Sequence, residues 1–513
     1  MSDRENQALR DIIRGTGIAG VGLVLELLVS FLAQILAARY LSVDGFGGLV
    51  VGMAVIDVAA IVGSLGLDEG FIRFLPRYTE GEKTAIVRTA YLVCIPVSLV
   101  VGAVVVFGAN TFAGVVFDDP RVATSLRVFG LAIPFATALQ LARGGIRGQK
   151  VPRYNVYVEN LLRPLSRAVL VTAAVVYGVG QLGLSGAYAL PFVLASVVAV
   201  PLFWTTLASS NGDADVGRVD LPRLVELLEY SLPFSVAKAA WFVLRSIDVF
   251  LILSFLGAPS VGVYGAVYAF SRFILMFSTA ANFLGAPVAS ELEAEAEHDG
   301  LFRVNESLFR WLGIVSVPAL APFLFFPGAL LSLVYRPAYA TGASALVVLA
   351  IGFAVHNVLS VQENVLRAYG AAKLVAANHV AAAAINVVLN VLFIPRYGIV
   401  GAALATAVAY AVSGVLALAE IRVRTGRLTL SRRIVMPFLV GVPVLGLGAV
   451  VAEGVPRTLP WIVGFSAVIA LAYWSCMLSL FGLSSAEVML VRSIEERYGL
   501  RLGPLDRVLE WFT

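Results

Sequence analysis

The stretch from residue 85 to residue 110 reads AIVRTAYLVCIPVSLVVGAVVVFGAN and holds one charged side chain, Arg88, close to its start. A helix that crosses a bilayer needs about 20 mostly apolar residues at a rise of about 1.5 Å per residue. This stretch is long and apolar enough, and similar runs recur along the chain between short polar breaks. They predict fourteen spans, at residues 14–39, 44–67, 85–110, 122–142, 154–178, 183–208, 229–256, 260–288, 305–332, 340–366, 374–395, 398–420, 433–452 and 459–482.

The composition of the whole chain agrees with this interpretation. Of 513 residues, 59% are apolar and 14% are charged, whereas a soluble chain carries about 25% charged residues. The predicted fold class is therefore an all-α, polytopic membrane protein. A net charge of +4 gives no indication of nucleic-acid binding. Cys94 and Cys476 both lie in apolar stretches, so no disulfide framework or metal site is expected.

The positive charges predict the orientation. With the N-terminus inside, the inner segments hold most of the 37 Lys and Arg residues, among them Arg73, Arg77, Arg143 and Arg147. Because basic residues concentrate on the cytoplasmic side, both termini are expected there, in a multi-pass protein of the cell (plasma) membrane. Residues 484–513 are predicted to form a cytoplasmic or interfacial tail.

Two pairs of matching stretches indicate an internal repeat. Residues 41–47 (LSVDGFG) parallel residues 256–262 (LGAPSVG), and Gly183 and Gly186 parallel Gly398 and Gly401. Both pairs are 215 residues apart, and six spans lie between them. Six is an even number, so the copies have the same orientation, which predicts two lobes with a site between them near the midplane. The expected domains are residues 1–210 and 211–430 as six-helix lobes, residues 431–483 as two additional helices, and the tail.

Charged residues inside the predicted spans mark the candidate site. A charge at the bilayer centre costs about 2.5–3.5 kcal/mol on insertion scales, so each needs a partner, water or a function. The expected substrate-binding residues are the bases Arg163, Arg167, Lys238, Arg245 and Arg272, which would line a water-filled cationic cavity for an anionic substrate. The acids Glu26, Asp57 and Asp248 are candidates for coupling or charge balance, and no catalytic residue is expected. Internal salt bridges without further function, such as Asp248 with Arg245, are the alternative.

Polar residues on the tenth and eleventh predicted spans also remain open to two interpretations. They either join neighbouring helices or contact a cation or a sugar, and they are Asn357, Gln362, Glu363, Asn364, Asn386 and Asn390. The three histidines are too dispersed for a metal set. No phosphate-binding loop of the G-x-x-x-x-G-K-[ST] type occurs, which argues against ATP hydrolysis.

Several motifs resemble the polysaccharide and lipid-linked oligosaccharide flippases of the multidrug/oligosaccharidyl-lipid/polysaccharide exporter superfamily. The motifs are residues 38–47 (ARYLSVDGFG), 66–76 (GLDEGFIRFLP), 229–234 (EYSLPF) and 386–403 (NVVLNVLFIPRYGIVGAA). Their order and spacing carry the resemblance over roughly residues 10–430.

The resemblance implies a two-lobed, alternating-access transporter of twelve or fourteen helices. It also implies that a polyprenyl- or dolichyl-phosphate-linked oligosaccharide is turned from the cytoplasmic to the outer leaflet. Membrane lipids and glycosyltransferases of the same pathway are the expected partners. No cofactor is expected, and a proton, a sodium ion or the membrane potential would supply coupling. The rival interpretations are a cation-coupled multidrug exporter and a membrane-embedded glycan polymerase or ligase.

Overall fold

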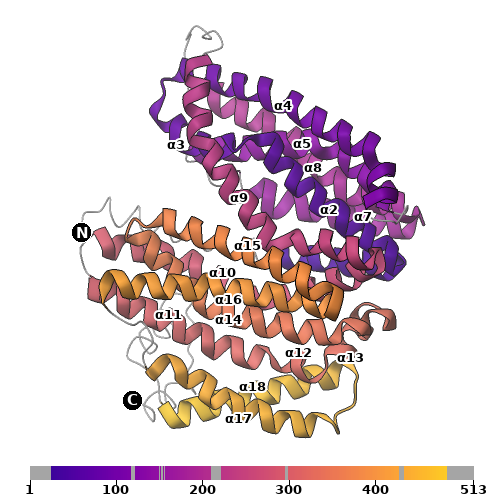
Figure 1. The fold of residues 1–513 in the computed structure, drawn as a ribbon, viewed down its shortest axis with the longest axis vertical. Coiled ribbons are helices and arrows are strands. Elements are labelled where there is room, and N and C mark those ends of the chain that lie inside the picture. The colour runs from indigo at the N-terminus through magenta and orange to yellow at the C-terminus, as the bar shows by residue number, and fades with distance from the viewer. Residues whose placement is uncertain are drawn as a thin grey trace, which may run out of the picture. The chain divides into compact units, whose positions relative to one another are not determined.

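The computed structural model describes residues 25–116, 122–149, 151, 154, 156–208, 221–294, 298–426 and 432–481. Within these ranges every regular element is a helix (Figure 1). The all-α prediction is therefore confirmed. The predicted tail and the first half of the first predicted span lie outside the described residues.

The first half of the chain contains a helix over residues 25–40 and the elements up to residue 208. They are α2 (Val43–Ser64), α3 (Leu67–Phe74), η1 (Leu75–Arg77), α4 (Glu80–Thr111), η2 (Phe112–Val116), α5 (Val122–Gly148), η3 (Val156–Leu162), α7 (Arg163–Val176) and α8 (Gly180–Ala208). The second half begins with α9 (Leu221–Leu256), α10 (Ala258–Ala294), α11 (His298–Ala319), α12 (Ala321–Phe325) and α13 (Pro327–Val334). It continues with η4 (Pro337–Gly342), α14 (Ala343–Ala368), α15 (Ala372–Tyr397), α16 (Ile399–Thr425), α17 (Arg432–Ala452) and α18 (Leu459–Phe481).

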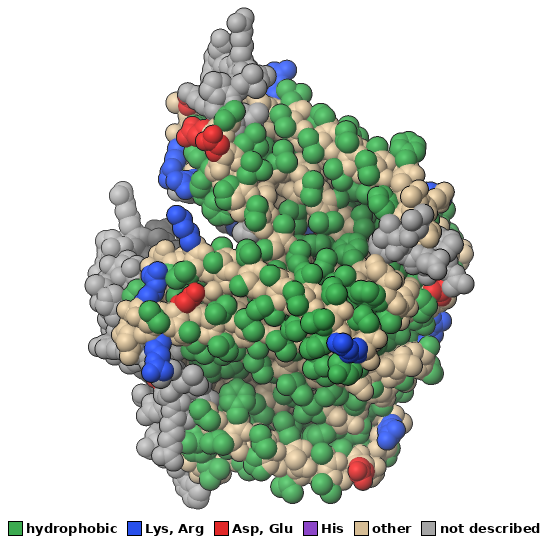
Figure 2. Space-filling model, viewed as in Figure 1, with side chains coloured by type: hydrophobic (Ala, Val, Ile, Leu, Met, Phe, Trp, Pro, Cys, Tyr) green, Lys and Arg blue, Asp and Glu red, His purple; other side chains and the backbone are tan. Residues whose placement is uncertain are grey.

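Twelve helices within the described ranges are long and apolar enough to cross a membrane. They match twelve of the fourteen predicted spans. Of the first span, only residues 25–40 are described. The fifth corresponds to η3 and α7, which together carry Glu159, Arg163 and Arg167 and include a π-helical segment. On the face of the molecule drawn in Figure 2, hydrophobic side chains cover most of the described surface, as expected for helices in contact with lipid.

The described chain separates into two compact units, which do not follow the predicted lobes residue by residue. Unit 1 comprises residues 1–269, 334–345 and 379–409, and unit 2 comprises residues 270–333, 346–378 and 410–513. The predicted boundaries near residues 210 and 430 stay a prediction.

Local sequence explains how the helices at the start of unit 1 begin and end. Ser42 caps α2 by accepting a hydrogen bond from the backbone N–H of Gly45, at 3.2 Å. Thr79 opens α4 with a capping box, in which its own N–H donates to Glu82 at 2.9 Å. Gly66, with a φ of 73°, makes the turn between α2 and α3, and a Cβ there would lie 2.5 Å from the carbonyl oxygen of Ser231. That turn therefore packs directly on α9.

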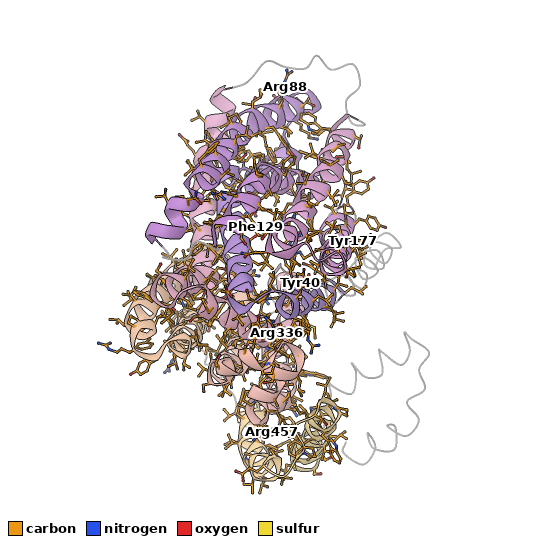
Figure 3. The ribbon with its side chains drawn as sticks, turned by 90° about the vertical axis from the view of Figure 1, so that its right-hand side faces the viewer. Tyr40, Arg88, Phe129, Tyr177, Arg336 and Arg457 are labelled. Carbon is orange, nitrogen blue, oxygen red and sulfur yellow. The ribbon has the colours of Figure 1, made fainter. Side chains whose placement is uncertain are left out.

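Small residues let the helices of unit 1 approach closely. Gly52 of α2 faces the ring of Phe129 on α5, and Gly145 of α5 faces Phe203 on α8. A Cβ at either glycine would lie 2.2 Å or less from the ring (Phe129 is labelled in Figure 3). Lipid chains are as apolar as leucine, so close van der Waals packing of this kind holds membrane helices together.

The closest approach in unit 1 joins the two matching stretches of the repeat. A Cβ on Gly47 would lie 1.9 Å from the carbonyl oxygen of Ala258, and one on Gly262 would lie 2.1 Å from the carbonyl oxygen of Val43. Gly47 and Gly262 are 215 residues apart in the sequence. The N-terminal turns of α2 and α10 therefore cross backbone to backbone, each through its glycine.

A pair of reciprocal hydrogen bonds lies elsewhere in unit 1, between the C-terminal ends of two helices. Arg39 donates from Nε to the carbonyl oxygen of Val334 at 2.7 Å, and Arg336 donates to the carbonyl oxygen of Leu41. The hydroxyl of Tyr339 donates to the carbonyl oxygen of Ala38 at 3.2 Å. Tyr40 and Arg336 are labelled in Figure 3. The end of helix 25–40 is thereby fastened to the segment that follows α13.

In unit 2, the last two spans pack against α11. Gly313 of α11 faces Pro437 of α17, and Gly441 of α17 faces Val317 of α11. The hydroxyl of Tyr473 on α18 donates to the carbonyl oxygen of Pro437 at 3.1 Å. Helices α17 and α18 therefore belong to this compact unit.

Candidate functional site

Seven of the eight predicted site residues lie in unit 1, and Arg272 lies in unit 2. Arg272 is half-buried on α10. The seven lie on four helical segments, namely residues 25–40, α2, α7 and α9, and their charged partners Asp68, Glu69, Arg143 and Glu159 lie on α3, α5 and η3. Unit 1 is therefore where their geometry is described.

An acid in the π-helical segment organises the bases around α7. Glu159 is buried, and its carboxylate pairs with Arg163 at 2.6 Å and with Arg143 of α5 at 3.2 Å. The Arg163 guanidinium also lies 5.1 Å from the ring centroid of Phe192 on α8. Arg163 is thus held in place by one carboxylate and one aromatic ring.

Arg167, one turn further along α7, is held differently. Its guanidinium lies 5.1 Å from the ring centroid of Tyr188, a cation–π contact. Its buried Nε has no hydrogen-bond partner within the described part of the chain. A buried arginine donor of this kind is suited to a phosphate oxygen.

Electrostatic interactions join these bases to the predicted acids. Arg163 interacts with Asp57, Glu26 and Arg245. Arg167 interacts with the same two acids. Five predicted residues from four helical segments that are far apart in the sequence are therefore near enough to influence one another electrostatically. We call Glu26, Asp57, Arg163, Arg167 and Arg245 the charged cluster.

Two members of the charged cluster are exposed within helices that are long enough to cross the membrane. Asp57 lies in the second half of α2, and Arg245 lies past the middle of α9. An ionised side chain that faces hydrocarbon is costly, by about 2.5–3.5 kcal/mol or more. These two positions therefore require water, not lipid, as their surroundings.

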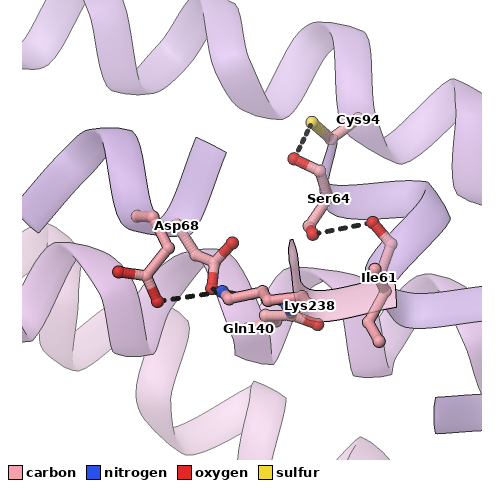
Figure 4. A network of polar contacts seen from close by, with 7 residues as sticks. Ile61, Ser64, Asp68, Cys94, Gln140 and Lys238 are labelled. Carbon is pink, nitrogen blue, oxygen red and sulfur yellow. Dashed lines mark hydrogen bonds and ion pairs between the residues drawn. The ribbon is translucent and has the colours of Figure 1, made fainter. Parts of the chain in front are cut away.

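Lys238 is engaged by two acids that the sequence analysis did not assign to the site. Its Nζ pairs with Asp68 and, at 3.0 Å, with Glu69, and Gln140 donates to the same Asp68 oxygen at 3.4 Å (Figure 4). Asp68 and Glu69 begin α3, and Lys238 lies on α9. Both acids stand in the quoted stretch 66–76, but nothing in their spacing pointed to a base 170 residues away.

Asp248 is fully buried and contacts neutral donors. It accepts hydrogen bonds from the hydroxyl of Tyr264 at 2.5 Å, from the hydroxyl of Thr406 at 3.3 Å and from the N–H of Val249 at 2.9 Å. Asn386 donates to Thr406 at 3.4 Å, and Asn390 donates to Asn386. Within the described residues no ion pair joins Asp248 to Arg245, the pairing offered above as an alternative.

The polar residues of the tenth predicted span join helices inside unit 2. Glu363 pairs with Arg367 at 2.7 Å and accepts from Ser413 at 3.5 Å. Asn357 donates to Ser316 at 3.2 Å and to the carbonyl oxygen of Ile274. Asn305 donates to Gln362 at 3.2 Å. These contacts agree with the interpretation of this set as polar links between helices.

Solved structures share this arrangement of helices. The lipid II flippase MurJ, in an inward closed conformation, aligns with a TM-score of 0.72 at 12% identity, covering 90% of this chain and 98% of that one. A multidrug resistance transporter of the MATE family and the MOP superfamily, in an inward-facing conformation, aligns with a TM-score of 0.61 at 16% identity, covering 79% and 98%. The chain thus has the same fold as these two membrane proteins.

Comparison of the sequence with known proteins identifies the family to which this chain belongs. The profile of the polysaccharide biosynthesis protein family matches residues 12–293, and the chain belongs to that family. An uncharacterized membrane protein of Methanocaldococcus jannaschii is 22% identical over 74% of this chain and 90% of its own length. The probable low-salt glycan biosynthesis flippase Agl15 of Haloferax volcanii is 25% identical over 76% of this chain and 79% of its own length. The resemblance found in the motifs is confirmed.

Proposed function

We propose that this protein flips a polyprenyl- or dolichyl-phosphate-linked oligosaccharide from the cytoplasmic to the outer leaflet by alternating access around a central cationic cavity. The observation that carries the proposal is the charged cluster. It consists of three arginines and two acids on predicted spans, with Asp57 and Arg245 exposed where lipid contact would be costly. A hydrated, arginine-lined space fits a phosphate better than any neutral or cationic substrate.

Two relatives support the same class of substrate. Agl15 is described as a probable glycan biosynthesis flippase, and MurJ is a lipid II flippase. Lipid II and lipid-linked glycans share a chemistry: an apolar chain, a phosphate-containing link and a sugar headgroup. The apolar chain would remain in the bilayer while the charged and sugar parts cross through water.

The residues of the site take separate roles in this proposal. Arg167 and Arg245 bind the phosphate, and Arg272 on α10 is a further candidate base for substrate binding. Arg163 is positioned by Glu159. Lys238 exchanges its carboxylate partners for phosphate when the substrate enters. Glu26 and Asp57 balance the charge of the empty cluster.

We assign coupling to Asp248. A buried carboxylate surrounded by hydroxyl and amide groups is stabilised by taking up a proton or a sodium ion. Asp248 lies on α9 three residues after Arg245, less than one helical turn away, and this proximity links the occupancy of Asp248 to the bases. No ATP-driven step is needed.

The cell membrane, with both termini in the cytoplasm, is the proposed location, and glycosyltransferases that build the glycan are the proposed partners.

A cation-coupled multidrug exporter is the second candidate function, because the MATE transporter shares the fold. The arginines of the charged cluster disfavour it, since they would repel an organic cation.

The test uses purified full-length protein in proteoliposomes that contain a fluorescently labelled dolichyl-phosphate-linked sugar. A membrane-impermeant quencher measures how fast the label changes leaflet. Wild-type protein should accelerate the exchange, and Arg245→Ala and Arg272→Ala should abolish most of the acceleration. Arg457→Ala, an exposed arginine between α17 and α18, is the control. If both site variants keep the wild-type rate at equal reconstitution, the cationic cavity is wrong.

A further inference from the structure

Helix α9 carries an aromatic side chain beside the charged cluster that none of the interactions above uses. Trp241 lies three residues after Lys238 and four before Arg245, so the three side chains share one face of the helix. Phe242 and Leu244, on the packed side of α9, are buried, whereas Trp241 keeps 37% of its surface exposed. The open face of α9 therefore presents an indole between two bases.

A second ring lies against this indole. His379, on α15 in the same unit, has its ring centroid 4.7 Å from that of Trp241, with the planes tilted by 46°. An imidazole in a spanning helix is costly to expose to hydrocarbon and usually faces the bundle interior or water. Because His379 and Arg245 are both costly to expose to hydrocarbon, we infer that the exposed side of the Trp241 indole, which lies beside them, faces the same water as the charged cluster.

We propose that Trp241, supported by His379, is a stacking platform for a sugar ring of the transported lipid. The inference rests on the proposed function and deepens it by assigning the subsite for the glycan. The flat face of a pyranose ring carries C–H groups, and the face of an indole is apolar with a negative quadrupole, so the two stack while the sugar hydroxyls remain in water.

The spacing along α9 matches a sugar joined to a phosphate. Trp241 and Arg245 are four residues apart, which is about 6 Å along the helix axis and close to the width of one sugar ring. A phosphate held by Arg245 would therefore place the first sugar at the indole. The arginines bind any lipid phosphate, and the platform distinguishes a glycosylated lipid from the bare carrier.

The experiment measures affinity of the purified full-length protein in detergent for two probes, dolichyl phosphate and dolichyl phosphoryl mannose. Trp241→Leu keeps the apolar bulk and removes the aromatic face. It should weaken binding of the mannosylated lipid by about tenfold, the upper range of a ring-stacking contribution, and leave binding of dolichyl phosphate unchanged. Trp241→Phe and His379→Phe should retain most of the affinity because they keep aromatic rings.

The matched control is Phe255→Leu, which removes another exposed aromatic ring from the same helix near its end. It should change neither affinity. If Trp241→Leu binds the mannosylated lipid as wild-type protein does, or loses affinity for both probes equally, the platform is wrong while the flippase proposal stands. If wild-type protein binds neither probe, the proposed function itself fails and the platform falls with it.

Discussion

Replacement of Gly47 by alanine tests how closely the two copies of the repeat pack. The added Cβ would lie 1.9 Å from the carbonyl oxygen of Ala258, 2.8 Å from its carbonyl carbon and 3.0 Å from the nitrogen of Gly262. All three are backbone atoms, so no side chain can rotate away. Ordinary contact begins at 3.4 Å, so α2 and α10 must separate by about 1.5 Å at their crossing.

The cost should appear as lost stability of the detergent-solubilised protein. Overpacking of a tight contact costs about 1–3 kcal/mol, against which alanine in a helix gains about 0.5–1 kcal/mol over glycine. We expect a net destabilisation of about 1–2 kcal/mol. It should appear as a lower midpoint temperature when thermal denaturation is monitored by size-exclusion chromatography.

Gly186→Ala is the matched control. Gly186 lies in α8, another spanning helix, and a Cβ there meets nothing within 4 Å. This variant should be as stable as wild-type protein or more so. Equal stability of Gly47→Ala and Gly186→Ala would refute the backbone-to-backbone crossing of the two glycines.

Three further outcomes follow from the ion pairs and hydrogen bonds of unit 1. Lys238→Met should destabilise the protein by about 1–3 kcal/mol, because it leaves Asp68 and Glu69 without their base, and adding Asp68→Asn should recover much of the loss in the same thermal assay. Glu159→Gln should destabilise by about 2–4 kcal/mol, since two arginines lose their shared carboxylate; a midpoint unchanged from wild type would contradict the described pairing. Asp248→Asn should fold normally, because an amide keeps most of the hydrogen bonds, yet flipping should lose its dependence on pH and sodium; dependence that persists would exclude Asp248 as the coupling residue.

The class of fold could be predicted from the sequence because the signal is local. Each span is an apolar run whose length is set by the bilayer, so its presence needs no knowledge of its neighbours. The glycine match at a spacing of 215 residues predicted a repeat, and the contact between Gly47 and Gly262 is something that the match did not predict. The fifth predicted span departs from a regular α-helix, because residues 156–162 form a π-helix, and an apolar run in the sequence does not distinguish the two kinds of helix.

The candidate site could be predicted only as a set of side chains. The cost of a charge in hydrocarbon singled out Arg163, Arg167 and Arg245 without revealing their partners. Pairing depends on which helices meet, so Lys238 was not matched with Asp68. Asp248 and Arg245 are near neighbours in the sequence, but one is buried and the other exposed, and spacing alone does not separate these cases.

The reciprocal hydrogen bonds of Arg39 and Arg336 are of a kind that can break and re-form at low energetic cost. Both guanidiniums bind carbonyl oxygens at the C-terminal ends of helices, groups that lack an intrahelical donor and carry partial negative charge. When the two ends part, each carbonyl and each guanidinium is simply taken over by water, and no ionised acid is left stranded in the apolar interior. This pair of hydrogen bonds therefore needs little free energy to break. Because the acceptors are backbone carbonyl oxygens, substitutions of the side chains of Leu41 and Val334 leave them in place.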